Sequence, residues 1–258
     1  MPRRRYGQNF LHDPRIARRI AAAAEASPGV GVFEIGPGLG ALTIPLLESG
    51  AKVTAIEIDP RVADFLEAEL AGRGNFSLVR GDVCEADLDR LAEGARVLVA
   101  NLPYSITGPI LALLIDRPER FDRAVLMMQK EVALRITAKP GEREMGAVSV
   151  LLRLLWRLER LFDVGAGAFL PAPEVVSSVL RFTRIPGAVL DPFVKDAVNR
   201  AYRQRRKTLK KTLAGAVADE GSLARALTAL GYPDTARPES VAPADWPRLV
   251  ALARVETS

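Results

Sequence analysis

A glycine-rich turn follows an apolar run early in the chain, in the segment Val32-Phe33-Glu34-Ile35-Gly36-Pro37-Gly38-Leu39-Gly40. Glycine lets the backbone turn tightly and lets a ligand approach it closely. Dinucleotide-binding sites begin with a similar turn and place an acidic residue about 20 residues further on, and Glu57 stands there in this chain. Gly36, Gly38 and Glu57 are therefore candidate cofactor-binding residues, and a nicotinamide cofactor is one candidate ligand.

Three features of the same region favour a cationic cofactor instead. Pro37 lacks the N–H that such a turn would donate to a pyrophosphate. Asp82 follows a further apolar run and adds a carboxylate at the same edge of the predicted sheet. With Glu34 and Glu57 it makes the site acidic, which suits a sulfonium better than a diphosphate. Glu57 is expected to accept hydrogen bonds from ribose hydroxyls, and Asp82 from an adenine amino group. The alternative interpretation is that Asp82 caps the next helix.

The next apolar run ends in Asn101-Leu102-Pro103-Tyr104, a group suited to methyl transfer to an exocyclic amine. The lone pair of such an amine is delocalised into its ring. The side-chain oxygen of Asn101 and a main-chain carbonyl such as that of Leu102 can accept both N–H groups and favour a pyramidal nitrogen. Tyr104 offers a face for stacking the base, and Pro103 stiffens the turn. The alternative interpretation is an ordinary turn at the end of a strand.

Apolar runs alternate with helical patterns through the first two thirds of the chain, which predicts an α/β fold with a parallel sheet covered on both faces. Strands are predicted at 32–35, 53–58, 76–79, 97–100 and 124–128, and helices at 41–48, 61–71, 106–115 and 130–137. An earlier helix is expected to begin at Asp13-Pro14. Two further runs, 156–164 and 175–182, are candidates for an antiparallel pair of strands at the sheet edge.

Strand-like runs end at Ile185-Pro186-Gly187, and only helical patterns follow. This change predicts two domains, a Rossmann-like domain over 1–186 and a smaller all-helical domain over 187–258. In the second, apolar residues at near-i+4 spacing predict a basic helix over 191–217. Its apolar stripe would pack against the rest of the protein: Val194, Val198, Tyr202, Leu209, Leu213 and Val217. The basic side chains would then point outward.

The net charge of +5 is unevenly distributed. Residues 1–19 hold six Arg and one Asp, and residues 195–211 hold eight basic residues and one acidic residue, so the remainder is net acidic. Two basic patches on an acidic protein indicate a polyanionic partner. The candidate RNA-binding residues are Arg203, Arg205, Arg206, Lys207, Lys210 and Lys211. The alternative is a solvated helix face.

Scarce residue types exclude several kinds of site. One His and one Cys rule out a structural zinc site built from these residues and a disulfide within the chain, and no metal is expected. The single histidine, His12, receives no role. The longest uncharged stretch, 97–115, contains Asn, Pro and Gly and is not a membrane span, and no signal peptide is evident. We therefore expect a cytoplasmic monomer.

Taken together, these motifs resemble the ribosomal RNA adenine N6-dimethyltransferases of the KsgA type, which share a fold with the Erm resistance methyltransferases. The resemblance covers roughly residues 5 to 250. Beyond the glycine turn and Asn101–Tyr104, it is carried by Tyr6-Gly7-Gln8-Asn9-Phe10-Leu11, Met128-Gln129-Lys130-Glu131-Val132, Phe169-Leu170-Pro171-Ala172-Pro173 and Ala201-Tyr202-Arg203-Gln204-Arg205-Arg206-Lys207-Thr208-Leu209. The chain departs from the family pattern at Ser105, Thr107-Gly108 and Val176.

The resemblance implies a cofactor, S-adenosyl-L-methionine, and a substrate. It implies that Asn9 and Leu11 help to bind the cofactor, beside Gly36, Gly38, Glu57, Asp82 and Asn101. It also implies that Phe169 stacks on a flipped target adenine opposite Tyr104. The implied substrate is a pair of adjacent adenines near the 3′ end of the 16S rRNA of the small ribosomal subunit, each converted to N6,N6-dimethyladenosine during subunit maturation.

Other functions remain open on the sequence alone. One is an Erm-like methyltransferase that acts on large-subunit rRNA. A second is a non-catalytic ribosome assembly or transcription factor that keeps the fold, against which the intact Asn101, Tyr104, Glu57 and Asp82 argue. A third is methylation of an amine in DNA or of a protein glutamine, against which the basic C-terminal region argues.

Overall fold

The computed structural model describes residues 9–255. Residues 6–8 of the opening motif and the arginines at 3–5 lie outside this range. The chain divides into two compact units, Met1–Ala133 with Leu158–Arg184, and Leu134–Arg157 with Ile185–Ser258. The predicted division at residue 186 had placed 134–157 in the α/β domain, whereas these residues group with the C-terminal helices.

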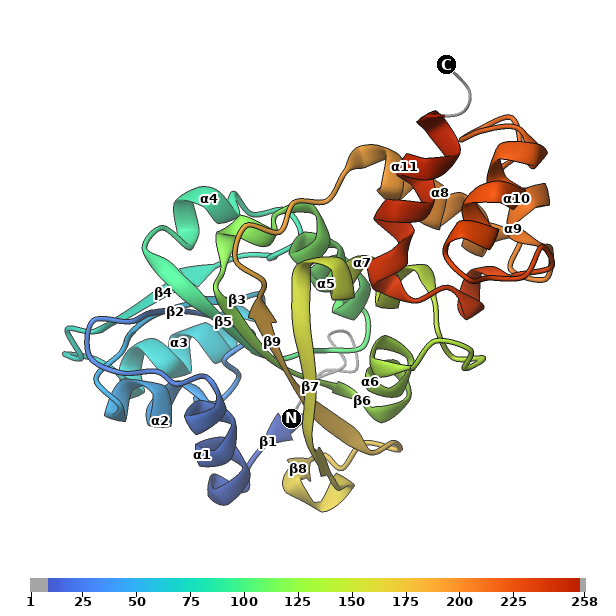
Figure 1. The fold of residues 1–258 in the computed structure, drawn as a ribbon. Helices are drawn as coiled ribbons and strands as arrows, with labels where there is room; N and C mark the ends of the chain where they lie inside the picture. Colours follow the sequence, from blue (N-terminus) through green and yellow to red (C-terminus); the bar gives the residue numbers. More distant parts are fainter. Residues whose placement is uncertain (1–8, 256–258) are drawn as a thin grey trace. The chain divides into compact units, whose positions relative to one another are not determined.

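The first unit is built on a seven-stranded sheet in the order β4-β3-β2-β5-β6-β9-β7 (Figure 1). Strands β2 to β6 are mutually parallel, and β9 runs antiparallel to β6. Their bounds are β2 (Gly31–Ile35), β3 (Lys52–Glu57), β4 (Phe76–Arg80), β5 (Ala95–Asn101), β6 (Arg123–Gln129), β7 (Trp156–Val164) and β9 (Ser177–Arg184). The predicted parallel sheet and α/β fold are confirmed.

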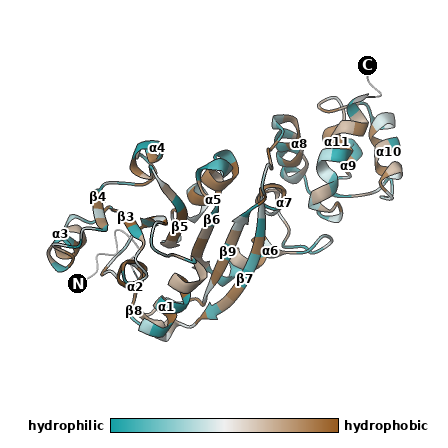
Figure 2. Cartoon of the chain, turned by 60° about the vertical axis from the view of Figure 1, so that its left-hand side comes forward, coloured by the Kyte–Doolittle hydropathy of each residue, from teal (hydrophilic) through white to brown (hydrophobic). Residues whose placement is uncertain are grey.

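Helices cover both faces of this sheet, with α1, α2 and α3 on one side and α4 and α5 on the other (Figures 1 and 2). Their bounds are α1 (Pro14–Ala23), α2 (Thr43–Glu48), α3 (Pro60–Glu69), α4 (Leu88–Leu91), α5 (Thr107–Asp116), η2 (Pro118–Arg120) and α6 (Lys130–Thr137). Helix α1 begins as predicted, because the Asp13 side chain accepts from the Arg15 N–H at 2.9 Å and Pro14 occupies the first helical position.

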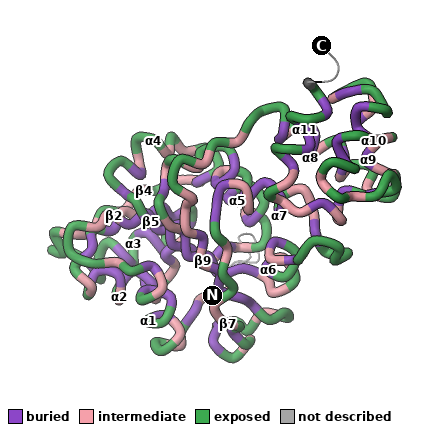
Figure 3. Tube along the Cα trace, in the orientation of Figure 1, coloured by how far each residue is buried: buried purple, intermediate pink, exposed green. Residues whose placement is uncertain are grey.

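Side chains on successive strand residues alternate between the two faces of the sheet. In the central strands β2, β5 and β6 nearly every residue is buried, whereas β4 and β7 at the edges are largely intermediate or exposed (Figure 3). Val32 and Val53 belong to the core cluster formed with α1, α2 and α3. Phe33 lies on the opposite face, where its ring stacks on that of Phe121 with 6.5 Å between the centroids. Near-continuous burial explains why the strands read as apolar runs in the sequence.

A second, two-stranded sheet joins β1 (Phe10–Leu11) to β8 (Phe169–Leu170), which follows the short helix η3 (Ala166–Ala168). The strands are antiparallel, with Phe10 opposite Leu170 and Leu11 opposite Phe169. The sequence patterns did not predict this pairing. Strands of two residues have no measurable periodicity, and these two come from distant parts of the chain.

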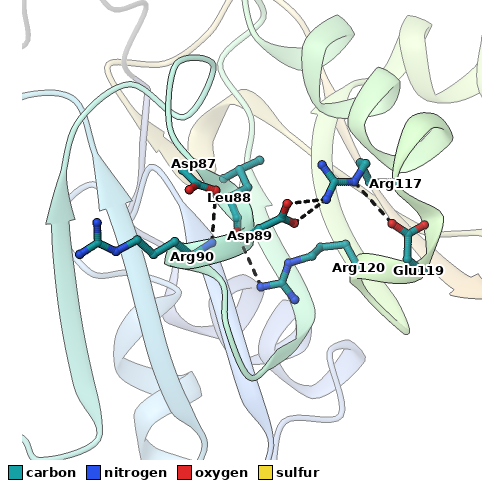
Figure 4. Close-up of polar contacts among 7 residues, drawn as sticks. All are labelled: Asp87, Leu88, Asp89, Arg90, Arg117, Glu119 and Arg120. Carbon is teal, nitrogen blue, oxygen red and sulfur yellow. Dashed lines mark hydrogen bonds and ion pairs between the residues drawn. The ribbon is translucent and has the colours of Figure 1, made fainter.

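Surface ion pairs connect α4 to the end of α5 (Figure 4). Arg117 contacts Asp89 at 2.5 Å and Glu119 at 3.4 Å, and its side chain and that of Asp89 are 48% and 58% exposed. Water screens such a pair, so the Arg117→Ala variant is expected to keep nearly the parent unfolding free energy in urea titrations. Arg120→Ala is the comparison, because half-buried Arg120 donates to the Ala95 carbonyl at 3.3 Å and should lose more. A larger loss for Arg117→Ala would contradict this assignment.

The second unit is helical apart from the first residues of β7. Its elements are α7 (Ala147–Leu155), α8 (Pro192–Arg203), α9 (Leu209–Leu213), α10 (Glu220–Ala229), η4 (Pro238–Ser240), η5 (Pro243–Asp245) and α11 (Trp246–Val255), together with the last residues of α6. The predicted helix over 191–217 is wrong in length. Helix α8 ends at Arg203 with Gln204 as its C-cap, and Thr208 takes the extended conformation of an N-cap before α9. No helix in the described part of the chain is long and apolar enough to cross a membrane.

Candidate functional site

A cavity of about 230 Å³ lies at the carboxyl ends of β2, β3, β4 and β5. In open α/β sheets this edge is where ligands bind. Every residue that the sequence analysis assigned to cofactor binding or to catalysis lines this cavity: Asn9, Leu11, Gly36, Gly38, Glu57, Asp82, Asn101, Leu102, Pro103, Tyr104 and Phe169. The fold therefore brings both predicted groups of residues to one place.

The glycine turn after β2 forms one wall of the cavity. Gly36 and Gly38 adopt φ values of +64° and +56°, a conformation that side-chain-bearing residues rarely take. A Cβ atom at Gly36 would meet no protein atom within 4 Å, so open space borders the backbone there. At Gly38 a Cβ atom would lie 3.0 Å from the ring of Phe10, which covers the turn. The turn thus leaves room for a ligand against bare backbone.

Glu57 ends β3 beneath this turn and is only 3% exposed. Its carboxylate accepts from the Asp59 N–H at 2.9 Å and from the Gly38 N–H at 3.3 Å. Burial raises the pKa of Glu57, and these two backbone donors oppose the rise. A carboxylate offers about four acceptor positions, so Glu57 keeps acceptor capacity for a ligand.

Glu34, on β2, is buried even more deeply, with 1% exposure. Burial raises its pKa to about 8, the nearby Thr43 hydroxyl opposes the rise, and the charge of Glu57 adds to it. Its Oε2 atom has no hydrogen-bond partner among the described residues. On the sequence alone, Glu34 belongs to the predicted acidic set but has no individual role.

Asp82 follows β4, and its carboxylate accepts from the Cys84 N–H at 2.8 Å. This bond closes a turn. No helix begins there, because α4 starts at Leu88 and has Asp87 as its N-cap. The alternative interpretation of Asp82 as a helix cap is therefore wrong, and Asp82 instead lines the cavity.

The Asn101 amide is held in a defined orientation at the end of β5. Its Nδ2 atom donates to the main-chain oxygen of Asn9 at 3.3 Å, which leaves Oδ1 as an acceptor. The Leu102 N–H donates to the Met127 oxygen at 2.9 Å, whereas the Leu102 oxygen accepts no hydrogen bond from the described residues. Two acceptors thus stand side by side on the chain at the cavity.

Two aromatic residues complete the wall. Tyr104 is 43% exposed. Partial burial and the nearby charge of Glu174 raise the pKa of the Tyr104 hydroxyl, and a hydrogen bond with Gln129 opposes the rise. Phe169 is 4% exposed and is held by the pairing of β8 with Leu11 of β1. The two-stranded sheet of β1 and β8 therefore positions both the Phe169 ring and Leu11 at the cavity.

Sequence reasoning missed two contributors to this site. Phe10 packs over Gly38, and Gln129 bonds to Tyr104. Both lie within motifs that carry the family resemblance, and only that resemblance could have indicated that they belong to the site. Neither residue type nor spacing identifies a residue that acts through a neighbour.

The predicted RNA-binding residues lie in the second unit, between the end of α8 and α9. Arg203, Arg206, Lys207 and Lys211 are exposed and make no ion pair with other described residues. Two more are engaged within the unit: Arg205 donates to the Arg143 oxygen at 2.6 Å, and Lys210 pairs with Asp234 at 2.5 Å. The exposed Arg143 side chain, which the sequence analysis did not select, is thereby brought next to this basic surface.

Comparison with known proteins extends these observations. The family described as ribosomal RNA adenine dimethylase matches residues 2–227. A protein of Gloeobacter violaceus named Ribosomal RNA small subunit methyltransferase A is 44% identical over 245 residues, covering 92% of this chain and 88% of the relative. A protein of the same name from Magnetococcus marinus is 44% identical over 220 residues, covering 82% and 78%.

Two solved structures have the same fold over nearly the whole chain. A dimethyladenosine transferase from Plasmodium falciparum superimposes with a TM-score of 0.79 at 25% identity, covering 93% of this chain and 95% of the other. The 23S rRNA methyltransferase ErmE superimposes with a TM-score of 0.78 at 28% identity, covering 95% and 99%. With a family match over most of its length and a cavity lined by all the predicted cofactor-binding and catalytic residues, this chain belongs to the ribosomal RNA adenine dimethylase family.

Proposed function

We propose that this protein transfers methyl groups from S-adenosyl-L-methionine to N6 of two adjacent adenines near the 3′ end of 16S rRNA, giving N6,N6-dimethyladenosine during maturation of the small ribosomal subunit. One observation carries the proposal. The cofactor-binding and amine-binding residues line a single cavity. The relatives named for the small subunit support this choice of rRNA.

The cavity fits such a cofactor. Open space beside Gly36 accommodates a ligand against the backbone, and Glu57 and Asp82 retain free acceptor capacity for hydroxyl and amino groups. We assign Asn9 and Leu11 to the same ligand, since both line the cavity. The cofactor, when bound, supplies a methyl group on a positively charged sulfur. An acidic cavity favours that charge.

The protein's part in the reaction is to hold and orient the target amine. Asn101 Oδ1 and the Leu102 oxygen accept its two N–H groups, so the nitrogen lone pair is directed at the methyl group. Holding two reactants in line lowers the barrier without a strong base. The proton that leaves the nitrogen after transfer passes to solvent.

The aromatic residues hold the base itself. We propose that the flipped adenine stacks between Tyr104 and Phe169, while Pro103 stiffens the turn that carries Tyr104. Gln129 positions the Tyr104 ring through its hydroxyl. Ser105, at one of the departures from the family pattern, also lines the cavity.

The second unit is proposed to bind rRNA through Arg203, Arg205, Arg206, Lys207, Lys210 and Lys211. Arginine and lysine side chains contact phosphates without reading sequence, so they position the RNA while its shape determines the target. We expect the exposed side chains to contribute more than Lys210, whose charge is already paired with Asp234.

Salt dependence tests this basic surface. The double substitution Arg206→Ala/Lys207→Ala is expected to weaken binding to small subunits and to flatten the slope of log K against log salt by about 1.4 to 1.8, because each lost phosphate contact removes about 0.7 to 0.9. Filter binding or fluorescence anisotropy at several salt concentrations measures the slope. The matched control is Lys52→Ala/Arg73→Ala, two exposed basic residues of the first unit, which should keep the parent slope. An unchanged slope in the first variant would remove these residues from the RNA contact.

Labelled methyl groups test the function directly. The protein is incubated with S-adenosylmethionine carrying a labelled methyl group and with unmodified small or large subunits, and the labelled nucleotides are mapped. We expect N6,N6-dimethyladenosine at two adjacent positions near the 3′ end of 16S rRNA. Label in large-subunit rRNA alone would favour the Erm-like activity. Binding without any label would favour a non-catalytic assembly factor.

A further inference from the structure

Glu34 is a buried acidic residue to which the reaction described above assigns no task. It is 1% exposed, it lines the cavity, and its Oε2 atom has no partner among the described residues. An ionised carboxylate in such a place is costly unless a cation or hydrogen-bond donors compensate it. Consistent with this, burial raises the pKa of Glu34 to about 8, so most of the free protein carries a neutral Glu34 at pH 7.

Among residues 9–255, nothing around Glu34 supplies a compensating charge. Its strand neighbours in register are Ala55 on β3 and Val99 on β5, and helix α2 presents the Thr43 hydroxyl. The charged group that faces it is the carboxylate of Glu57, which disfavours a second negative charge. Among the described residues, no arginine, lysine or histidine pairs with Glu34. A cation is therefore missing from its environment unless a ligand brings one.

The order of the strands indicates where a ligand would bring that charge. Moving along the edge, Asp82 follows β4, Glu57 ends β3, the glycine turn follows β2 and Asn101 ends β5. Neighbouring strands are about 4.8 Å apart. If Glu57 holds the ribose and Asn101 holds the target amine, the sulfur that carries the methyl group must lie between them, at the end of β2. Glu34 is the acidic residue of that strand.

We propose that Glu34 distinguishes the cationic cofactor from its neutral thioether product, S-adenosylhomocysteine, by releasing a proton when the sulfonium binds and taking one up after the methyl group has left. The inference rests on the proposed use of S-adenosylmethionine. On binding, the carboxyl proton passes to solvent and the carboxylate faces the sulfonium. On transfer, the S–CH3 bond breaks, the N–CH3 bond forms, and the amine loses one proton. Glu34, now beside a neutral sulfur, takes up a proton from solvent, and the product loses its electrostatic attraction.

The direction of the pH dependence follows from this linkage. Below about pH 8 the free protein holds the proton that sulfonium binding must displace, so affinity for S-adenosylmethionine rises with pH by up to about tenfold per unit. Above about pH 8 the proton is already absent, and the rise ends. The product has the same amino and carboxylate groups as the cofactor, so the ratio of the two affinities isolates the contribution of the sulfonium.

Isothermal titration calorimetry tests the proposal without relying on turnover. S-Adenosylmethionine and S-adenosylhomocysteine are each titrated into the full-length protein at pH 7 in phosphate and in imidazole buffer, whose ionisation enthalpies differ. We expect the cofactor to release close to one proton more than the product, at most about one per site. We also expect the affinity ratio of cofactor to product to rise several-fold between pH 6 and pH 7.

Matched Glu→Gln variants assign the proton to a residue. In Glu34→Gln the difference in proton release should disappear and the affinity ratio should become independent of pH. Glu48→Gln, which changes an exposed glutamate of α2, should behave like the parent protein. Circular dichroism verifies the fold of each variant. If Glu34→Gln does not fold, the proton counts of the unmodified protein still decide whether the two ligands differ.

The outcomes separate this inference from the proposed function. Equal proton release for the two ligands would overturn it, although cofactor binding itself would stand. Full proton release retained in Glu34→Gln would also overturn it and would point to Glu57 as the group that titrates. If the unmodified protein binds neither ligand, the proposed function fails as well.

Discussion

The Asn101→Ala substitution is expected to lower kcat for methyl transfer by about 10²- to 10³-fold, because it removes an acceptor aimed at the reacting amine. The substitution also removes the Nδ2 donor that bonds to the Asn9 oxygen, so the segment that contains Asn9 loses its hydrogen bond to the end of β5. Affinity for small subunits should change little, since the proposed phosphate contacts belong to the second unit. Single-turnover methylation and equilibrium binding measure the two effects separately.

Asn75→Ala is the matched control for this prediction. Asn75 donates to the main-chain oxygens of Leu47 and Ala51 and does not line the cavity. Its loss should lower stability and leave kcat near that of the parent. An Asn101→Ala protein with parental kcat would rule out the proposed role of the amide.

Phe33→Ala is expected to reduce the unfolding free energy by about 3–5 kcal/mol, the usual cost of emptying a fully buried phenylalanine site. The Phe33 side chain is 0% exposed and stacks on Phe121, so its removal leaves a cavity beneath the sheet and a ring without its neighbour. Urea denaturation followed by circular dichroism measures the change in the midpoint and the slope.

Phe65→Ala provides the comparison, because it makes the same substitution on α3 where the ring is 43% exposed. It should cost less than about 1 kcal/mol, as surface substitutions usually do. Equal losses in the two variants would mean that Phe33 is not in a tightly packed core. Together with the small effect expected for Arg117→Ala, this comparison would show that buried side chains contribute more to the stability of this unit than surface ion pairs do.

The parallel strands and the glycine turn were predictable because each depends on a few adjacent residues. Strands buried on both faces appear as short apolar runs, and a turn that needs positive φ selects glycine. Carboxylates placed at the ends of such runs meet at one sheet edge, which is why Glu57 and Asp82 were identified. The family resemblance added Asn9, Leu11 and Phe169, for which local pattern offers no signal.

Other features depended on contacts between distant segments. The basic helix was predicted too long because apolar spacing continues from Val198 through Leu209, although the backbone leaves the helix after Arg203. Residues 134–157 group with the C-terminal unit by contacts that no composition shift reveals. The engagement of Lys210 by Asp234 likewise follows from packing of the second unit.

The sequence by itself determined the residue types at the sheet edge: a bare glycine backbone, a set of carboxylates, an amide and an aromatic face. Only the tertiary structure decided how these groups act on one another. It pairs β1 with β8, bonds the Asn101 amide to the Asn9 oxygen, and places β2 between β3 and β5. Glu34 is thereby buried with no cation from the described residues beside it. The physical reason is that spacing reports local periodicity, whereas desolvation and charge depend on every segment packed around a group.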